Sequence, residues 1–174
     1  MTTLETERLI LRPFVDDDLS AFAAICADPE VMRYIGSGQP LSRAGAWRAI
    51  ALFIGHWRLR GYGQWAVVEK ESGELVGRAG LWNPEGWPGL EVGWLLARSR
   101  WRQGLGTEAA RASLDYAFDV VRADHVISVI HAENVASIRL AEKIGERFER
   151  QATVDGIEVG IYGVSWRGRV SEQL

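Results

Sequence analysis

Three consecutive strand-like segments place the strongest constraint on the fold of this chain. Residues 63–70 and 74–82 are rich in valine, leucine and tryptophan, and a turn that contains Gly73 joins them. A third segment of the same kind, residues 90–97, follows a stretch rich in proline and glycine. Consecutive strands with short connections pair with one another, so we expect an antiparallel meander near the middle of the chain.

Helical patterns surround this meander. Apolar residues repeat at helical spacing in several segments, and Asp16 to Asp18 can cap the first of them. In chain order the other expected elements are a strand (4–12), helices (16–27 and 42–60), then after the meander a helix (104–121), a strand (125–130), a helix (134–144) and two strands (148–154 and 157–166). The order β-α-α-β-β-β-α-β-α-β-β predicts an α/β fold with a mixed, mostly antiparallel sheet and helices on both faces.

The length of 174 residues is that of one domain. We expect this domain to span residues 1–168 and a short C-terminal tail to occupy residues 169–174. No internal repeat or linker interrupts the pattern.

Composition and charge argue against several classes of protein. The formal net charge of -3 lacks the basic excess of proteins that bind nucleic acid. The one cysteine, Cys26, lies in an apolar stretch, so we expect a buried structural thiol and neither a disulfide framework nor a metal site. No run approaches the roughly 18 apolar residues of a membrane span, and the N-terminus lacks the apolar core of a signal peptide. We therefore expect a cytoplasmic protein without nucleic-acid or membrane partners.

A glycine-rich turn opens the helix expected at residue 104. The turn consists of Arg102, Gln103, Gly104, Leu105, Gly106 and Thr107. The first amides of a helix have no partners within the helix and attract phosphate groups. Glycine removes side chains where the backbone approaches a ligand closely, so the turn predicts a pyrophosphate site.

Taken alone, this turn fits two cofactors. The spacing Gly104-x-Gly106-x-x-Ala109 also satisfies the dinucleotide-binding fingerprint, and Glu133 follows about 24 residues later. In that fold the first glycine follows its strand almost directly, whereas here residues 97–103 intervene, and the preceding strand belongs to an antiparallel meander. A nucleoside-triphosphate loop is excluded because no Gly-Lys-Ser or Gly-Lys-Thr follows. A plain tight loop is the remaining alternative.

Several motifs at characteristic separations narrow this choice. They are LETERLILRPF at residues 4–14, GRAGL at 77–81, the turn at 102–107 and NVASIRLAEKIG at 134–145. Together they resemble the GNAT superfamily of N-acyltransferases over nearly the whole chain, and within it the branch similar to ribosomal-protein N-acetyltransferases. The signature of the superfamily begins with glutamine or arginine, and Trp101 stands at that position, which resembles a variant of this branch.

The resemblance implies direct transfer of an acetyl group from acetyl-CoA to a primary amine in a ternary complex, without a metal. Positioning and stabilisation of the oxyanion then supply most of the catalysis. The main-chain groups of Trp94, Leu95 and Leu96 are expected to pair with the pantetheine arm and the acyl carbonyl. The backbone amides of residues 102–107 are expected to bind the pyrophosphate.

The last motif supplies further expected contacts. Asn134 opens a helix, where it either caps the helix or donates a hydrogen bond to the pantetheine amides. Ser137 matches a serine near the cofactor sulfur, and its expected role is hydrogen-bond donation or a water relay to the departing thiolate. Many members carry a tyrosine for this task where Ala141 stands here. Arg139 is a further expected contact to the cofactor phosphates.

A carboxylate is the usual base that deprotonates the acceptor amine. Glu91 is our candidate, because it lies on the strand before the glycine turn and alternates with the apolar Leu90 and Val92; a solvated sheet glutamate is the alternative. The other base position of the superfamily is Val129 here, which has no titratable group. For His131 we expect a structural or loop role.

The sequence leaves the acceptor open among a protein N-terminus, a small amine and an amino-acid derivative. Trp65, Trp82 and Trp87 are candidates for the wall of the acceptor pocket, and core packing or a subunit interface, including that of a homodimer, explains them comparably well. Two functions from other classes remain as alternatives: a non-catalytic coenzyme-A-binding module, and an NAD-dependent oxidoreductase.

Overall fold

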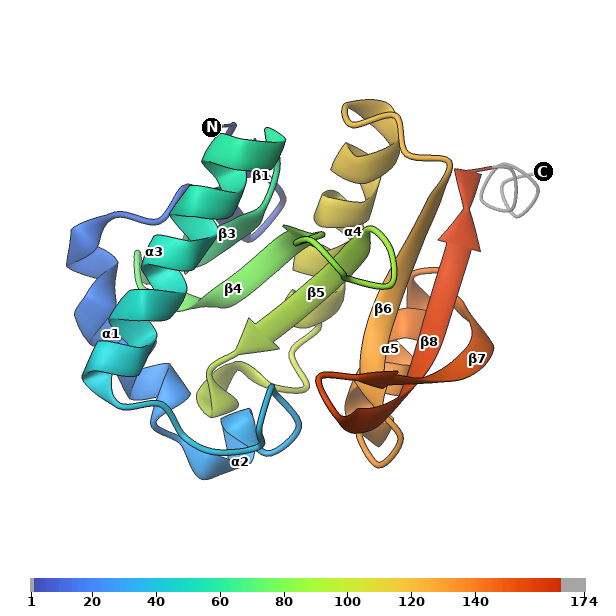
Figure 1. The fold of residues 1–174 in the computed structure, drawn as a ribbon. Coiled ribbons are helices and arrows are strands. Elements are labelled where there is room, and N and C mark those ends of the chain that lie inside the picture. The colour runs from blue at the N-terminus through green and yellow to red at the C-terminus, as the bar shows by residue number, and fades with distance from the viewer. Residues whose placement is uncertain (1, 167–174) are drawn as a thin grey trace.

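One eight-stranded sheet runs through the part of the chain that the computed structural model describes, residues 2–166 (Figure 1). The predicted tail at residues 169–174 lies outside the described residues. The strands are β1 (Leu4–Glu5), β2 (Leu9–Arg12), β3 (Gln64–Glu69), β4 (Leu75–Trp82), β5 (Glu91–Leu96), β6 (His125–His131), β7 (Arg147–Val154) and β8 (Ile157–Ser165). The helices are α1 (Leu19–Cys26), α2 (Pro29–Met32), α3 (Arg43–Arg60), α4 (Leu105–Asp119) and α5 (Val135–Lys143), with 3-10 turns at Asp16–Asp18 and Arg98–Arg100.

The strand order is β1-β2-β3-β4-β5-β6-β8-β7, and β5 with β6 is the one parallel pair in the described sheet. This pair has a single register contact, Glu91 opposite Ile127. The hydrogen bonds that join the two segments include those from the Ile127 amide to the Leu90 carbonyl and from Ser128 Oγ to the Val92 carbonyl, each 2.8 Å long. Beyond these contacts the two strands diverge (Figure 1).

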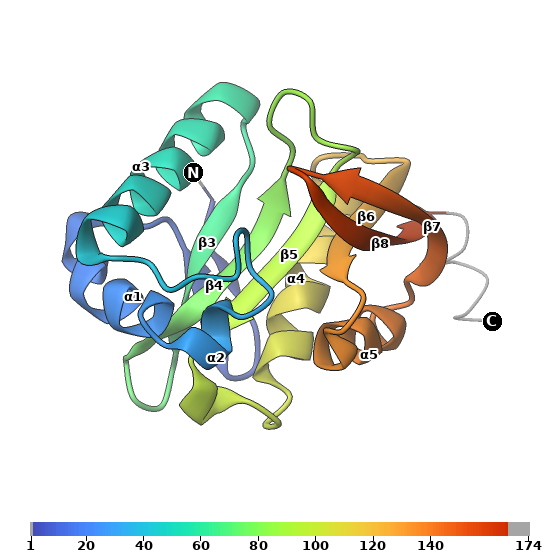
Figure 2. The same ribbon diagram turned by 60° about the horizontal axis from the view of Figure 1, so that its bottom comes forward.

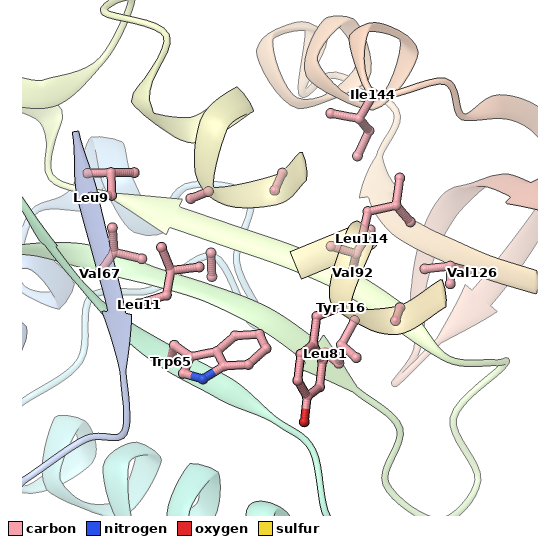
Figure 3. Close-up of a cluster of buried hydrophobic side chains, with 14 of the residues drawn as sticks. Leu9, Leu11, Trp65, Val67, Leu81, Val92, Leu114, Tyr116, Val126 and Ile144 are labelled. Atoms are coloured by element: carbon pink, nitrogen blue, oxygen red, sulfur yellow. The ribbon is translucent and has the colours of Figure 1, made fainter. Parts of the chain in front are cut away.

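Helices cover both faces of the sheet, as the sequence predicts (Figure 2). Helix α4 packs on one face, where Leu114 and Tyr116 meet apolar side chains of β2 to β5 such as Trp65 and Val92 (Figure 3). Helices α1 and α3 pack on the opposite face around Phe22 and other aromatic residues. Side chains that alternate along each strand therefore contribute to two separate hydrophobic cores, one on each face of the sheet. The central strands are buried on both faces.

The structure differs from the expected element order in two places before the meander. The segment 4–12 forms two short strands instead of one, because Thr6 folds back on Leu9: the Thr6 amide donates to the Leu9 carbonyl and the Leu9 amide to Thr6 Oγ1, both at 3.0 Å. After α1, the expected loop contains α2. Asp28 caps it by accepting a hydrogen bond from the Glu30 amide at 2.9 Å, and Pro29 occupies the first turn, where a missing N–H has no cost.

Candidate active site

A narrow pocket opens where β5 and β6 diverge. Its walls come from β4, β5, β6, the first turn of α5 and the segment after α2. Four side chains that the sequence singled out line it together: Glu91, Trp94, Asn134 and Ser137. Residues almost fifty positions apart in the sequence therefore share one site, at the opening between β5 and β6 in the middle of the sheet.

Glu91 begins β5 and lies on the opposite face of the strand from the fully buried Val92. Its Oε2 accepts a hydrogen bond of 2.7 Å from Nε1 of Trp87, which lies in the connection between β4 and β5. Burial raises the pKa of Glu91 to about 7, while Arg78, the Trp87 hydrogen bond and the Val129 backbone act in the opposite direction. A carboxyl group with a pKa near neutrality can accept a proton from an amine and release it again.

Trp94 and Ser137 connect the two sides of the pocket. Nε1 of Trp94 donates a hydrogen bond of 3.3 Å to Ser137 Oγ, which joins β5 to the first turn of α5. The Ser137 amide donates to Asn134 Oδ1 at 3.2 Å, so Asn134 does cap the helix, one of its two expected roles. Since the Ser137 oxygen accepts from the indole, its hydroxyl hydrogen remains available for a ligand.

The glycine turn leads into α4 through left-handed backbone. Gly104 has φ 82° and Arg102 has φ 61°, and no side chain of residues 2–166 caps the first amides of the helix. These amides come from Leu105, Gly106 and Thr107, and the Leu105 side chain itself is 2% exposed and belongs to the core. The arrangement is that of an anion-binding helix N-terminus.

Packing also favours glycine at position 106. A Cβ atom there would lie 3.1 Å from Leu140 Cδ1 and 3.5 Å from Leu96 Cδ1. Glycine at this position therefore lets α4 approach α5 and β5 closely. At Gly104 the positive φ is what favours glycine.

Side chains from outside the turn hold its conformation. Arg8 donates to the Gln103 carbonyl at 2.8 Å and forms an ion pair with Glu108 at 2.7 Å. Trp101, which stands at the unusual signature position, donates from Nε1 to the Leu96 carbonyl at 2.9 Å. Trp101 thus connects the turn to the end of β5. The Leu96 carbonyl, one of the main-chain groups expected to face the cofactor, already accepts this hydrogen bond.

The remaining predicted contacts differ in accessibility. Arg102 and Arg139 are exposed, while Gln103 directs its amide to the Ser99 carbonyl at 2.9 Å. Leu95 and Leu96 have buried side chains. Main-chain groups alternate along a strand and Ala97 donates to Val76 before β4, so those of Leu95 face β4, whereas those of Trp94 and Leu96 face the divergence from β6.

The three tryptophans that were candidates for the wall of the acceptor pocket lie in different surroundings. Trp65 is fully buried in the core and donates to the Thr2 carbonyl at 2.7 Å, so core packing, one of its expected roles, applies to it. Trp82 stacks on the His56 ring at 4.5 Å. Only Trp87 among these three contacts the pocket, through Glu91.

Arg78 and Tyr34 are among the pocket residues that sequence reasoning missed, and His131 has the structural role expected of it. Arg78 reaches the pocket from β4 and donates from Nη1 to Gln64 Oε1 at 2.8 Å. Tyr34 stacks on His131 with ring centroids 5.1 Å apart, so His131 forms part of the pocket wall. Alternation along β4 places Arg78 on one face, but only the strand register reveals that this is the face of Glu91.

A second buried carboxyl group, Glu146, follows α5. Its side chain is 0% exposed, and neither oxygen has a hydrogen-bond partner among residues 2–166. Burial raises the pKa of Glu146 to about 9, with Ser128 acting against the shift and the charges of Glu91 and Glu149 adding to it. Glu146 is therefore protonated at neutral pH in the folded protein.

Within residues 2–166, no helix is long and apolar enough to cross a membrane, and no group of three metal-ligating side chains occurs. Cys26 is buried as predicted, and burial raises the pKa of its thiol to about 11. The cytoplasmic location and the homodimer stay predictions.

Comparison with known proteins adds independent information. Residues 8–147 match the family model described as acetyltransferase (GNAT) domain. The uncharacterized protein YkkB of Bacillus subtilis (strain 168) is 34% identical over 157 residues, which cover 86% of this chain and 87% of that protein. The crystal structure of an acetyltransferase from Agrobacterium tumefaciens superposes with a TM-score of 0.83 at 30% identity over 94% of each chain. RimL, a ribosomal L7/L12 alpha-N-protein acetyltransferase solved with coenzyme A, shares the fold at 15% identity, with a TM-score of 0.79 over 94% of this chain and 98% of its own.

Proposed function

The chain belongs to the GNAT acetyltransferase family, and on that premise we propose that it transfers an acetyl group from acetyl-CoA directly to a primary amine. The observation that carries the proposal is the pocket at the divergence of β5 and β6, which brings Glu91 and Ser137 into one site. The glycine turn lies next to the end of the same strand, because Trp101 fixes it to the end of β5.

The residues present fit acetyl-CoA. The uncapped amides at the N-terminus of α4 suit the pyrophosphate, and the exposed Arg102 and Arg139 suit the remaining phosphates. Apart from the Leu96 carbonyl, which Trp101 occupies, the main-chain groups of Trp94 and Leu96 that face away from β4 are available to the pantetheine arm. Asn134 uses Oδ1 for the helix cap, so its NH2 group is the part available for a pantetheine carbonyl.

The proposed reaction has no covalent enzyme intermediate. Glu91 accepts the proton of the acceptor ammonium, directly or through a water molecule, and the amine nitrogen attacks the thioester carbonyl. A main-chain amide of β5 stabilises the oxyanion of the tetrahedral intermediate. When this intermediate collapses, the C–N bond is retained and the C–S bond breaks. The thiolate receives a hydrogen bond from Ser137 and a proton that a water molecule held there relays from the nitrogen, which loses its second proton as the amide forms.

An acceptor screen tests the proposal. Thiol release from acetyl-CoA is measured over a panel of amino acids, small amines and short peptides, beside the equilibrium binding of acetyl-CoA. We expect binding and turnover of at least one amine. Tight binding without turnover on any amine would favour a non-catalytic coenzyme-A-binding module, and thermal protection by NAD without protection by coenzyme A would favour an oxidoreductase.

The glycine turn supplies a matched pair of variants for the binding measurement. Gly104→Val places a β-branched side chain at φ 82°, so acetyl-CoA binding should be lost from a folded protein. Gly55→Ala in α3 is the control, because a Cβ atom there meets nothing within 4 Å and the position lies outside the turn. Unchanged binding in Gly104→Val would contradict the assignment of the pyrophosphate site.

A further inference from the structure

Two opposite charges line the pocket on the same face of the sheet without forming an ion pair with each other within residues 2–166. In the register of β4 and β5, Arg78 lies opposite Leu95 and Glu91 opposite Trp82. Between these two pairs lies Gly80 opposite Gly93. Arg78 and Glu91 therefore approach from the two ends of a short stretch that carries no side chain on this face of the sheet.

The polar atoms converge above Gly93. A Cβ atom added at Gly93 would lie 3.4 Å from Glu91 Oε1 and 3.8 Å from Arg78 Nη1. A carboxylate oxygen and a guanidinium nitrogen thus flank the same small space, which glycine keeps free of protein atoms. A ligand that enters this space meets a negative and a positive group at once.

Neighbouring side chains hold the two charged groups in these positions. Trp87 binds Oε2 of Glu91, which leaves Oε1 directed toward Gly93. Arg78 donates one hydrogen bond to Gln64, and its guanidinium lies over the Phe53 ring at 5.5 Å. A guanidinium has five N–H donors, and a partly buried charge gains most from a partner of opposite sign. The contacts of Arg78 leave donors for such a partner.

From this geometry we infer that the acceptor is a zwitterion with a carboxylate beside its amine, as in an α-amino acid. The inference rests on the proposed function: the ammonium lies at Glu91, which takes its proton, and the carboxylate pairs with Arg78. The N-terminal amine of a protein does not match, because the carboxyl group on its α-carbon is consumed in the first peptide bond. Arg78 then acts as a specificity-determining residue.

The test compares each amino acid with the amine that lacks its carboxyl group and with its amide. The measured quantity is the ratio of kcat/KM values within each pair, with acetyl-CoA as the donor. For the preferred amino acid we expect a ratio of at least about tenfold, as for loss of a charge-assisted hydrogen bond. A wild-type protein that uses the decarboxylated amine, the amide or a peptide N-terminus equally well or better would overturn the inference.

Variants of Arg78 connect the preference to this side chain. In Arg78→Gln the ratio should fall to near one, while the KM for acetyl-CoA is unchanged. Any effect of the lost charge on Glu91 acts on both members of a pair and cancels in the ratio. Arg78→Lys keeps a positive charge should the first variant not fold, and it should retain part of the preference. Arg43→Gln, on the exposed start of α3, is the control and should keep the wild-type ratio.

A binding experiment separates the two proposals. Calorimetry on the protein saturated with coenzyme A measures the affinity for the amino acid and for its decarboxylated amine, whether or not either is turned over. Preference for the amino acid without turnover supports Arg78 and contradicts the transferase. Turnover of amines without any preference, or equal affinities for the two ligands, contradicts the role of Arg78 alone.

Discussion

Trp87 Nε1 lies 2.7 Å from Glu91 Oε2 and donates a hydrogen bond to it. This contact joins the connection between β4 and β5 to the first residue of β5, and it fixes which carboxylate oxygen faces the pocket. A hydrogen bond to a carboxylate favours the ionised form, so Trp87 offsets part of the effect of burial on the pKa of Glu91. The loop tryptophan therefore controls both the orientation and the proton affinity of the proposed base.

Replacement of Trp87 by phenylalanine should shift the acidic limb of the pH dependence of kcat/KM to higher pH. Without the indole N–H the pKa of Glu91 rises further above 7, so kcat/KM at pH 6.5 falls more than kcat/KM at pH 8.5. The measurement is the pH dependence of kcat/KM in both proteins. Trp47→Phe, half-exposed on α3 and outside the pocket, is the control. Superimposable profiles for Trp87→Phe and the wild type would contradict the role of this hydrogen bond.

The buried carboxyl of Glu146 predicts a pH-dependent stability. Its pKa is about 9 in the folded protein against an ordinary value of 4.5, so the folded state holds a proton that the unfolded chain releases above pH 4.5. Stability is then lost as pH rises from 4.5 toward 9, by up to about 1.4 kcal/mol per pH unit. Glu146→Gln stays neutral and should be the more stable protein at pH 8, with little difference near pH 4.5.

Urea denaturation at pH 4.5, 6 and 8 measures this difference. The control is Glu71→Gln in the exposed turn between β3 and β4, which should show no comparable trend. If Glu146→Gln were less stable than the wild type at pH 8, the buried carboxyl would be making favourable contacts that its geometry does not provide.

Loss of the Ser137 hydroxyl should slow the departure of the thiolate. Ser137→Ala removes both the acceptor of the Trp94 hydrogen bond and the donor proposed for the thiolate. We expect kcat to fall by about tenfold or more while the Kd of acetyl-CoA changes little, because the interaction forms mainly in the transition state. Steady-state kinetics and calorimetry give the two values. Ser137→Thr, which retains the hydroxyl, should preserve most of the rate; an equal loss in both variants would indicate a packing effect.

The sequence predicts those parts of the fold and site that local patterns determine. The glycine turn and its helix are specified by residues next to one another, and so is the cap at Asn134. The alternation of Glu91 with Leu90 and Val92 suffices to place Glu91 on the face opposite the α4 core. The short helix α2 was missed because a proline after a helix reads as a stop, although Pro29 also starts the next helix.

The rest depends on contacts between distant segments. Only the register of β4 and β5 brings Arg78 and Glu91 to the same pocket, and no local sequence pattern specifies this register. Trp65 and Trp87 are equally plausible pocket residues by composition, yet the first is in the core and the second binds Glu91. Glu146 lies among charged residues that predict solvent exposure, and only the packing of the chain around it reveals a buried acid.

The pH dependence of acetyl transfer in Glu91→Gln and the wild type tests the central proposal most directly. With the best acceptor, the wild-type kcat/KM should rise through a pKa of about 7, and Glu91→Gln should lose about 100-fold at pH 7.5 with an unchanged Kd for acetyl-CoA. The acceptor titrates identically in both assays, so loss of this limb in the variant identifies Glu91 as the base. A variant that keeps the wild-type rate and the same pH profile would contradict it.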